Sequence, residues 1–124
     1  MQQKQEYNKM SSAEKLVAKY LDELGIKWRF EYPVFLKDER NRPRLWTPDF
    51  YLPDLNIYVE VCGSKDFDYK YRKRRYYENK IDVIYLHLYR DKEDWQNHFR
   101  KQLIVFIKER LTRLNKMMDL VIKK

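Results

Sequence analysis

The sequence of 124 residues contains a single cysteine, Cys62. One thiol cannot form an intramolecular disulfide, so a disulfide-stapled extracellular domain is excluded and a reducing compartment is favoured. No stretch approaches the roughly 20 apolar residues that a membrane-spanning helix needs. The opening residues, MQQKQEYNKM, lack the apolar core of a signal peptide. We therefore expect an intracellular, cytoplasmic protein that has no membrane partner.

Aromatic and charged side chains, in contrast, are abundant. The chain has 11 Tyr, 6 Phe and 3 Trp, and 44% of its residues are hydrophobic, which predicts a folded protein of one domain. Lys and Arg number 27 against 19 Asp and Glu, which gives a net charge of +8. This excess favours a polyanionic partner, most commonly nucleic acid, although a basic surface without such a partner is the alternative.

Hydrophobic periodicity predicts elements in the order α-β-β-β-α-β-α. A flexible segment at 1–10 precedes a single domain over 11–124, which shows no repeat, low-complexity tract or linker. The first helix begins at SSAE and ends at Gly25. Further elements are expected as strands at 26–36, 48–52 and 57–62, a basic helix within 66–80, a buried strand within 81–88 and a long helix over 92–124. The fold class is therefore α/β, with a mixed β-sheet flanked by helices.

The two central strands are expected to form a hairpin that turns at residues 53–56, PDLN. Side chains alternate between the two faces of a sheet, so the pairing fixes which residues share a face. It sets Leu52 opposite Ile57, Tyr51 opposite Tyr58, Phe50 opposite Val59 and Asp49 opposite Glu60. The apolar residues then share one face, and the two carboxylates lie on the other with Cβ atoms roughly 4.5–5.5 Å apart.

Two carboxylates at that distance repel each other unless a proton or a positive charge reduces the repulsion. One carboxyl could take up a proton, a lysine or arginine could pair with both, or a divalent cation could bind between them. Oxygen ligands favour Mg²⁺ or Mn²⁺, and a basic protein that meets phosphates favours this third solution. The alternative is that Asp49 and Glu60 lie on a solvated face. Glu14 could add a third carboxylate, but it also forms a capping box with Ser11, which needs no catalysis.

Glu14 on a helix, Pro48-Asp49 and Glu60 on a hairpin, and the helix and strand that follow resemble the PD-(D/E)XK nuclease superfamily. The resemblance covers about residues 11–90 and includes small stand-alone members similar to very-short-patch-repair nucleases or Holliday-junction resolvases. It implies a nuclease-like domain with a restriction-endonuclease-like fold that hydrolyses DNA phosphodiester bonds with Mg²⁺ or Mn²⁺. Asp49, Glu60 and the carbonyl of Val61 would hold the ion, which lowers the pKa of a bound water. Glu14 would be a further catalytic acid.

Position 62, where the family has a lysine that helps to activate the attacking water, is a cysteine here. A thiol supplies no fixed positive charge. Some branches of the family move this lysine to the next helix, and Lys73 is our first choice for it. Lys73 shares a helical face with three tyrosines, Tyr69, Tyr76 and Tyr77. The alternatives are Lys65, Lys70, or a catalytically inactive nucleic-acid-binding module that keeps the fold without the chemistry.

Basic residues cluster in two places that could contact DNA phosphates. Tyrosines alternate with basic side chains in YKYRKRRYY, at 69–77, and a charged loop lies before the hairpin. The predicted contacts are Arg40, Arg42, Arg44, Lys65, Lys70, Arg72, Arg74 and Arg75. A solvated basic helix face is the alternative. His87 and His98 are eleven positions apart on different elements, which is no metal-ligand spacing, so both are expected to be ordinary strand and helix residues.

The last helix carries apolar residues at a 3-4-3-4-3 spacing, which is typical of a coiled coil. They are Ile104, Ile107, Leu111, Leu114, Met118 and Val121. A continuous helix over 92–123 would be about 48 Å long, longer than such a domain. Either this helix breaks and folds back or its end pairs with another chain. We predict a homodimer, which would present two cutting sites.

Overall fold

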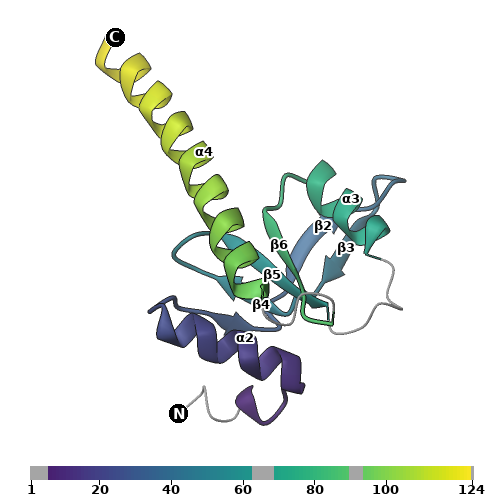
Figure 1. The fold of residues 1–124 in the computed structure, drawn as a ribbon. Coiled ribbons are helices and arrows are strands. Elements are labelled where there is room, and N and C mark those ends of the chain that lie inside the picture. Colours follow the sequence, from purple (N-terminus) through teal and green to yellow (C-terminus); the bar gives the residue numbers. More distant parts are fainter. Residues whose placement is uncertain (1–5, 63–68, 90–93, 124) are drawn as a thin grey trace.

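The computed structural model describes residues 6–62, 69–89 and 94–123. In chain order the elements are α2 (Ser12–Glu23), β1 (Arg29–Phe30), β2 (Val34–Lys37), β3 (Pro43–Trp46), β4 (Phe50–Leu52), β5 (Ile57–Cys62), α3 (Lys70–Glu78), β6 (Val83–His87) and α4 (Trp95–Lys123). The predicted α/β class is confirmed, with a mixed sheet flanked by helices and a long C-terminal helix that projects away from the sheet (Figure 1).

The main sheet has four strands in the order β1-β4-β5-β6. Strands β4 and β5 form the predicted antiparallel hairpin, with Tyr51 opposite Tyr58 as expected. Strands β5 and β6 are parallel, and the connection between them carries α3, which is the usual crossover between parallel strands. All six residues of β5 are buried, so this strand forms the centre of the domain.

The segment at 26–36, predicted as one strand, is two strands in different sheets. Residues 29 and 30 pair with β4, after which Glu31 takes a left-handed φ of 54° and turns the chain out of the sheet. Pro33, which has no N–H for a ladder, follows this turn. The chain then forms a second, two-stranded sheet in which Val34 faces Trp46. Much of the predicted charged loop is therefore the β2–β3 hairpin.

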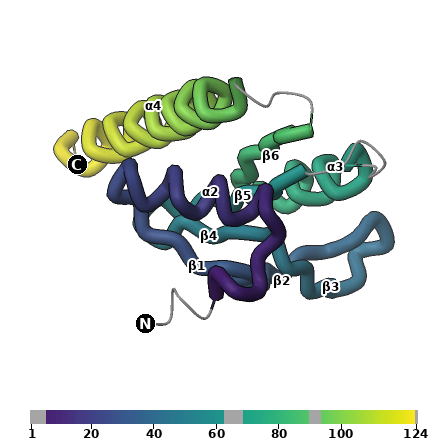
Figure 2. Tube along the Cα trace, turned by 60° about the horizontal axis from the view of Figure 1, so that its bottom comes forward, coloured from purple at the N-terminus to yellow at the C-terminus, as the bar shows by residue number. Residues whose placement is uncertain are grey.

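Apolar side chains cover both faces of the main sheet. On one face α2 and α4 pack over the strands, and Leu21, Phe99, Phe50 and Leu86 belong to this larger cluster. On the other face α3 and the β2–β3 hairpin pack around Tyr76, in a smaller cluster. Figure 2 shows this division, with α2 and α4 apart from α3 and the hairpin. The two carboxylates of the hairpin are thus covered by helices rather than exposed on a solvated face.

Helix α2 begins with the predicted capping box. The Glu14 N–H donates to the Ser11 hydroxyl at 3.2 Å, and the Ser11 N–H donates to Glu14 Oε1 at 2.8 Å. Part of the predicted flexible segment at 1–10 lies within the described residues, and it packs on this helix. Met10 is buried, and the Tyr7 hydroxyl donates to Asp22 at 2.7 Å. The expectation of a flexible segment did not anticipate these contacts.

Helix α4 is continuous over its 29 residues, about 43 Å, so it does not break and fold back. Lys92, where the helix was expected to begin, lies outside the described residues. Trp95 and Phe99 anchor the first turns in the core, whereas the second half projects beyond the sheet (Figure 1). None of the helices in the described part of the chain is both long and apolar enough to cross a membrane.

Candidate functional site

Asp49 and Glu60 lie opposite each other at the open end of the β4–β5 hairpin, away from its turn. The register that pairs Phe50 with Val59 sets them opposite each other when it is continued by one residue. The Val61 N–H donates to Asp49 Oδ2 at 2.6 Å, and the Asp49 N–H in turn bonds the Glu60 carboxylate. These reciprocal bonds across the hairpin hold both carboxylates in fixed positions beside the backbone of Val61.

Glu60 is buried and Asp49 is partly buried, and the pKa values of both carboxyl groups are raised. Burial raises the pKa of Asp49 to about 8; the Glu60 charge adds to the rise, and the Val61 N–H opposes it. Burial also raises the pKa of Glu60, against the charge of Arg72 and its hydrogen bond. At neutral pH and without a cation, Asp49 therefore holds a proton while Glu60 pairs with an arginine. This arrangement combines the predicted protonation of one carboxyl with an arginine that pairs with the other carboxylate, rather than with both as predicted.

Glu14 reaches the same site from α2. Its side chain lies within hydrogen-bonding distance of the Asp49 carboxyl, and this contact raises the pKa of Asp49 further. The same carboxylate accepts the Ser11 N–H of the capping box. The two roles that the sequence left open, a helix cap and an acid beside the hairpin, are thus held by one side chain.

Arg72 on α3 supplies the positive charge at this site. Its Nε lies 2.9 Å from Glu60 Oε2, and its Nη2 donates to the Tyr76 hydroxyl at 2.9 Å. The guanidinium also stacks over the Trp46 ring, 4.8 Å from its centroid. We had grouped Arg72 with the DNA-contacting residues. The missed signal is its position one helical turn before Tyr76, the tyrosine that α3 buries against the sheet.

Lys73, our first choice for the missing lysine, lies elsewhere. Its Nζ is 5.5 Å from the centroid of the Tyr85 ring on the neighbouring strand β6. Of the tyrosines grouped with Lys73 on one helical face, Tyr77 is 82% exposed, while Tyr76 is buried. Because Arg72 rather than Lys73 pairs with Glu60, the geometry does not favour the Lys73 assignment. Lys65 lies outside the described residues.

Cys62 is fully buried at the end of β5, on the strand that carries Glu60. The Tyr69 hydroxyl, just before α3, hydrogen-bonds the thiol. Burial, more than this bond, raises the pKa of Tyr69. At position 62, where the resemblance implies a lysine, the structure has a thiol beside a tyrosine hydroxyl, and the ion pair with Glu60 within the described residues comes from Arg72.

Asp38, which the sequence analysis did not single out, organises the basic residues of the β2–β3 hairpin. Its buried carboxylate accepts the N–H groups of Arg40 and Arg42 at 2.9 Å and the Nε–H groups of Arg42 and Arg44 at 3.1 and 3.0 Å. These bonds, the Arg42 N–H foremost, hold the pKa of Asp38 well below its usual range. The predicted arginine cluster exists, but one carboxylate offsets part of its charge.

The basic residues of α3 do not all face solvent. Arg75 is buried and forms an ion pair with Glu78 at 3.0 Å, so its position does not favour the predicted contact with DNA. Arg74 is exposed and bonds the other oxygen of Glu78 at 3.1 Å. Lys70, at the start of the helix, is exposed. Of the predicted contacts on this helix, Lys70 and Arg74 are the ones available to a phosphate backbone.

The β2–β3 hairpin and α3 are joined at both ends of the helix. The Asn79 side chain accepts the Lys37 N–H and donates to the Lys37 carbonyl, both at 2.8 Å. At the other end the Tyr71 hydroxyl donates to Glu39 at 2.6 Å. These bonds fix the hairpin against the helix that carries Arg72.

No family model matches this sequence, and no curated protein or solved structure is similar enough to count as a match. Within residues 6–62, 69–89 and 94–123, no three His, Cys, Asp or Glu side chains form a group able to hold a metal ion. Asp49 and Glu60, together with the backbone beside them, present a set of oxygen atoms. Such a set suits a hard cation whose remaining ligands are water and phosphate oxygens.

Proposed function

We propose that this protein is a metal-dependent endonuclease that hydrolyses DNA phosphodiester bonds, with a restriction-endonuclease-like core of the PD-(D/E)XK type. The observation that carries the proposal is the juxtaposition of the partly buried Asp49 and the buried Glu60 across the hairpin, where the pKa values of both are raised. Burying two acids side by side opposes folding, and such perturbed groups are concentrated at functional sites. The net charge of +8 provides attraction for a polyanionic substrate.

Each residue has a defined role in this proposal. Asp49, Glu60 and the Val61 carbonyl hold Mg²⁺ or Mn²⁺, and the Val61 N–H keeps Asp49 oriented. A cation bound there supplies an acidified water and offsets charge on the phosphate. Glu14 hydrogen-bonds the Asp49 carboxyl from α2 and is the further catalytic acid of the site. Arg72, beside Glu60, contributes the fixed positive charge that Cys62 cannot supply.

A second candidate is a nucleic-acid-binding module without catalytic activity. The observation that favours it is the ion pair of Arg72 with Glu60, which compensates the Glu60 charge without any metal. The thiol at position 62 agrees with this alternative. The arginines of the β2–β3 hairpin and the exposed Lys70 and Arg74 would then bind the phosphate backbone alone.

A cleavage assay separates the two candidates. Purified protein is incubated with supercoiled, linear, nicked, flapped and four-way DNA, and with RNA, in Mg²⁺, Mn²⁺ or EDTA. The endonuclease proposal expects metal-dependent cleavage that Asp49→Ala and Glu60→Ala each abolish. The matched control is Asp54→Ala, at an exposed carboxylate of the hairpin turn, which retains activity. DNA binding without cleavage of any substrate, unchanged by these variants, would instead establish the binding module.

We further propose that the projecting half of α4 pairs with a second copy of the chain. Leu111, Leu114, Met118 and Val121 follow the heptad spacing, and each is more than half exposed in the single chain. Light scattering should give a dimer mass that Leu111→Asp with Leu114→Asp reduces to that of a monomer. Lys116→Asp, on the opposite face of the helix, should leave the dimer intact. A monomer mass for the unmodified protein at micromolar concentration contradicts this proposal.

A further inference from the structure

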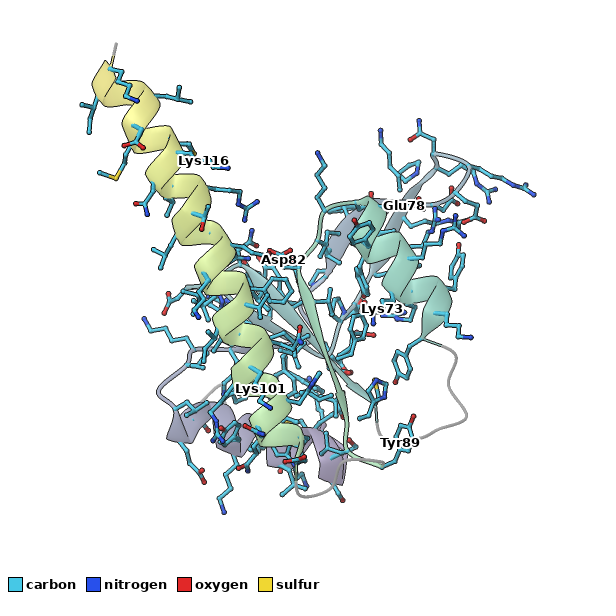
Figure 3. All side chains as sticks on the ribbon, turned by 45° about the horizontal axis from the view of Figure 1, so that its top comes forward. Lys73, Glu78, Asp82, Tyr89, Lys101 and Lys116 are labelled. Atoms are coloured by element: carbon cyan, nitrogen blue, oxygen red, sulfur yellow. The ribbon has the colours of Figure 1, made fainter. Side chains whose placement is uncertain are left out.

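A groove lies between α3 and α4, with β6 as its floor. Two cavities of about 350 and 300 Å³ share Lys73, Val83, Tyr85 and Phe106 in their walls, so they form one continuous depression. Figure 3 shows Lys73 on the α3 side of the space between the two helices and Asp82 just before β6. The hairpin residues Asp49 and Glu60 line neither cavity.

One end of the groove gathers hydrogen-bond donors from three elements. Lys73 comes from α3, His87 from β6, and His98 and Gln102 from α4. The eleven-residue spacing of the two histidines gave no indication that they share a wall. The Tyr85 hydroxyl beside them is buried and has no hydrogen-bond partner among the described residues. No acidic residue lines this cavity. A pocket that brings a lysine together with several further hydrogen-bond donors, and has no carboxylate in its lining, favours an anionic ligand.

The other end of the groove is flanked by rings and aliphatic groups. Phe106, Tyr77 and Ile81 line it, and the Tyr77 ring is 82% exposed. Two acids line this end, Asp82 and Glu109. Asp82 is paired with Arg110 at 2.8 Å, so its charge is compensated, and Glu109 is exposed to solvent on α4. Exposed aromatic faces of this kind stack well on nucleic-acid bases.

We propose that this groove is a binding site for a nucleoside phosphate, separate from the carboxylate pair of the hairpin. The phosphate contacts Lys73, His98 and Gln102, and the base lies along Phe106 and Tyr77. The ligand is either a free nucleotide or the phosphorylated end of a strand, which share this chemistry. The proposal goes beyond DNA cleavage and does not depend on it, because neither Asp49 nor Glu60 lines the groove.

Calorimetric titration in EDTA tests the site without metal binding at the hairpin. The probes are AMP, adenosine, inorganic phosphate and a short single-stranded oligonucleotide with or without a 5′ phosphate. AMP is expected to bind at least about tenfold more tightly than adenosine or phosphate alone, since a charge-assisted contact and a stacking contact are both needed. Binding of the phosphorylated oligonucleotide but not of AMP would identify the strand end as the ligand. Selective binding of AMP with equal affinity for the two oligonucleotides would identify the free nucleotide as the ligand. Equal affinity for AMP and adenosine together with equal affinity for the two oligonucleotides, or no binding of either phosphorylated probe at millimolar concentration, overturns the proposal.

Variants separate the groove from general electrostatic attraction. Lys73→Gln and His98→Ala should each weaken binding of the phosphorylated probe about tenfold or more. Lys101→Gln, next to Gln102 on α4 but outside the groove, is the matched control and should bind normally. A loss for Lys101→Gln equal to that for Lys73→Gln overturns the proposal. Asp49→Ala should retain full binding, so failure of the nuclease proposal would leave this result unchanged. As a second readout, the imidazole signals of His87 and His98 should shift in NMR spectra during titration.

Discussion

Replacing Arg72 by methionine tests the central ion pair of the site most directly. Methionine keeps much of the aliphatic stem over Trp46 but removes the charge that lies 2.9 Å from Glu60. The side chain of Arg72 is 23% exposed and that of Glu60 is 6% exposed, so water replaces little of the lost interaction. The variant therefore leaves a carboxylate that is both buried and unpaired.

The expected loss follows from the geometry. Opposite charges about 4 Å apart interact with roughly 4 kcal/mol at an effective dielectric constant of 20, and removing one partner of a buried pair typically costs about 3–5 kcal/mol. The hydrogen bond to Tyr76 adds about 1 kcal/mol. We expect Arg72→Met to lower the free energy of unfolding by about 3–5 kcal/mol at pH 7. The loss should be smaller at pH 5, because without Arg72 the raised pKa of Glu60 rises further and protonation removes the unpaired charge.

The assay is urea unfolding in EDTA for the unmodified protein, Arg72→Met, Glu60→Gln and the double variant. Because Glu60→Gln removes the charge that Arg72 balances, the double variant should be more stable than the sum of the two losses predicts, by about 2 kcal/mol. Arg74→Met is the control, because Arg74 is 75% exposed in its pair with Glu78 and should matter by less than about 0.5 kcal/mol. A coupling between Arg72 and Glu60 as small as this control would refute the reasoning.

Three further outcomes are expected. Asp49→Asn should stabilise the metal-free protein in urea unfolding, and the gain should grow from pH 4 to 8. The reason is that Asp49 keeps its proton in the folded protein up to about pH 8, whereas the same group has already lost it in the unfolded chain. A difference that does not depend on pH contradicts this. Asp38→Asn should lower the melting temperature at pH 7 but less below pH 4, because the lowered pKa of Asp38 stabilises the fold only while it is charged. Asn79→Ala should lower the free energy of unfolding by about 1–3 kcal/mol and speed hydrogen exchange at the Lys37 amide. Unchanged exchange would contradict the role of Asn79 in holding the hairpin against α3.

The parts of the fold that follow from local rules were predictable from the sequence. The hairpin register was correct because polar and apolar residues alternate on both sides of a clear turn, and that alternation fixes each strand face. The capping box of Ser11 and Glu14 is a local signal of the same kind. The proximity of Asp49 and Glu60 followed from the register alone. These predictions needed no knowledge of how distant elements pack.

The errors arose where tertiary packing decides the outcome. Helix α3 has basic and tyrosine residues on every side, so no apolar stripe shows which residue faces the sheet, and Lys73 was chosen where Arg72 makes the contact. The division of the first predicted strand depends on the left-handed conformation of Glu31, a residue type that rarely adopts it. The network around Asp38 required three arginines to converge on one acid, which their spacing alone does not reveal.

The double hydrogen bond of Asn79 has a mechanical consequence. Since this side chain hydrogen-bonds both the N–H and the carbonyl of Lys37, a shift of the β2–β3 hairpin must either break these bonds or move α3 with it. The exposed side chains of Arg42 and Arg44 lie on this hairpin, and Arg72 lies on α3 beside Glu60. A displacement of the hairpin would therefore also displace α3 and, through Arg72, the ion pair with Glu60.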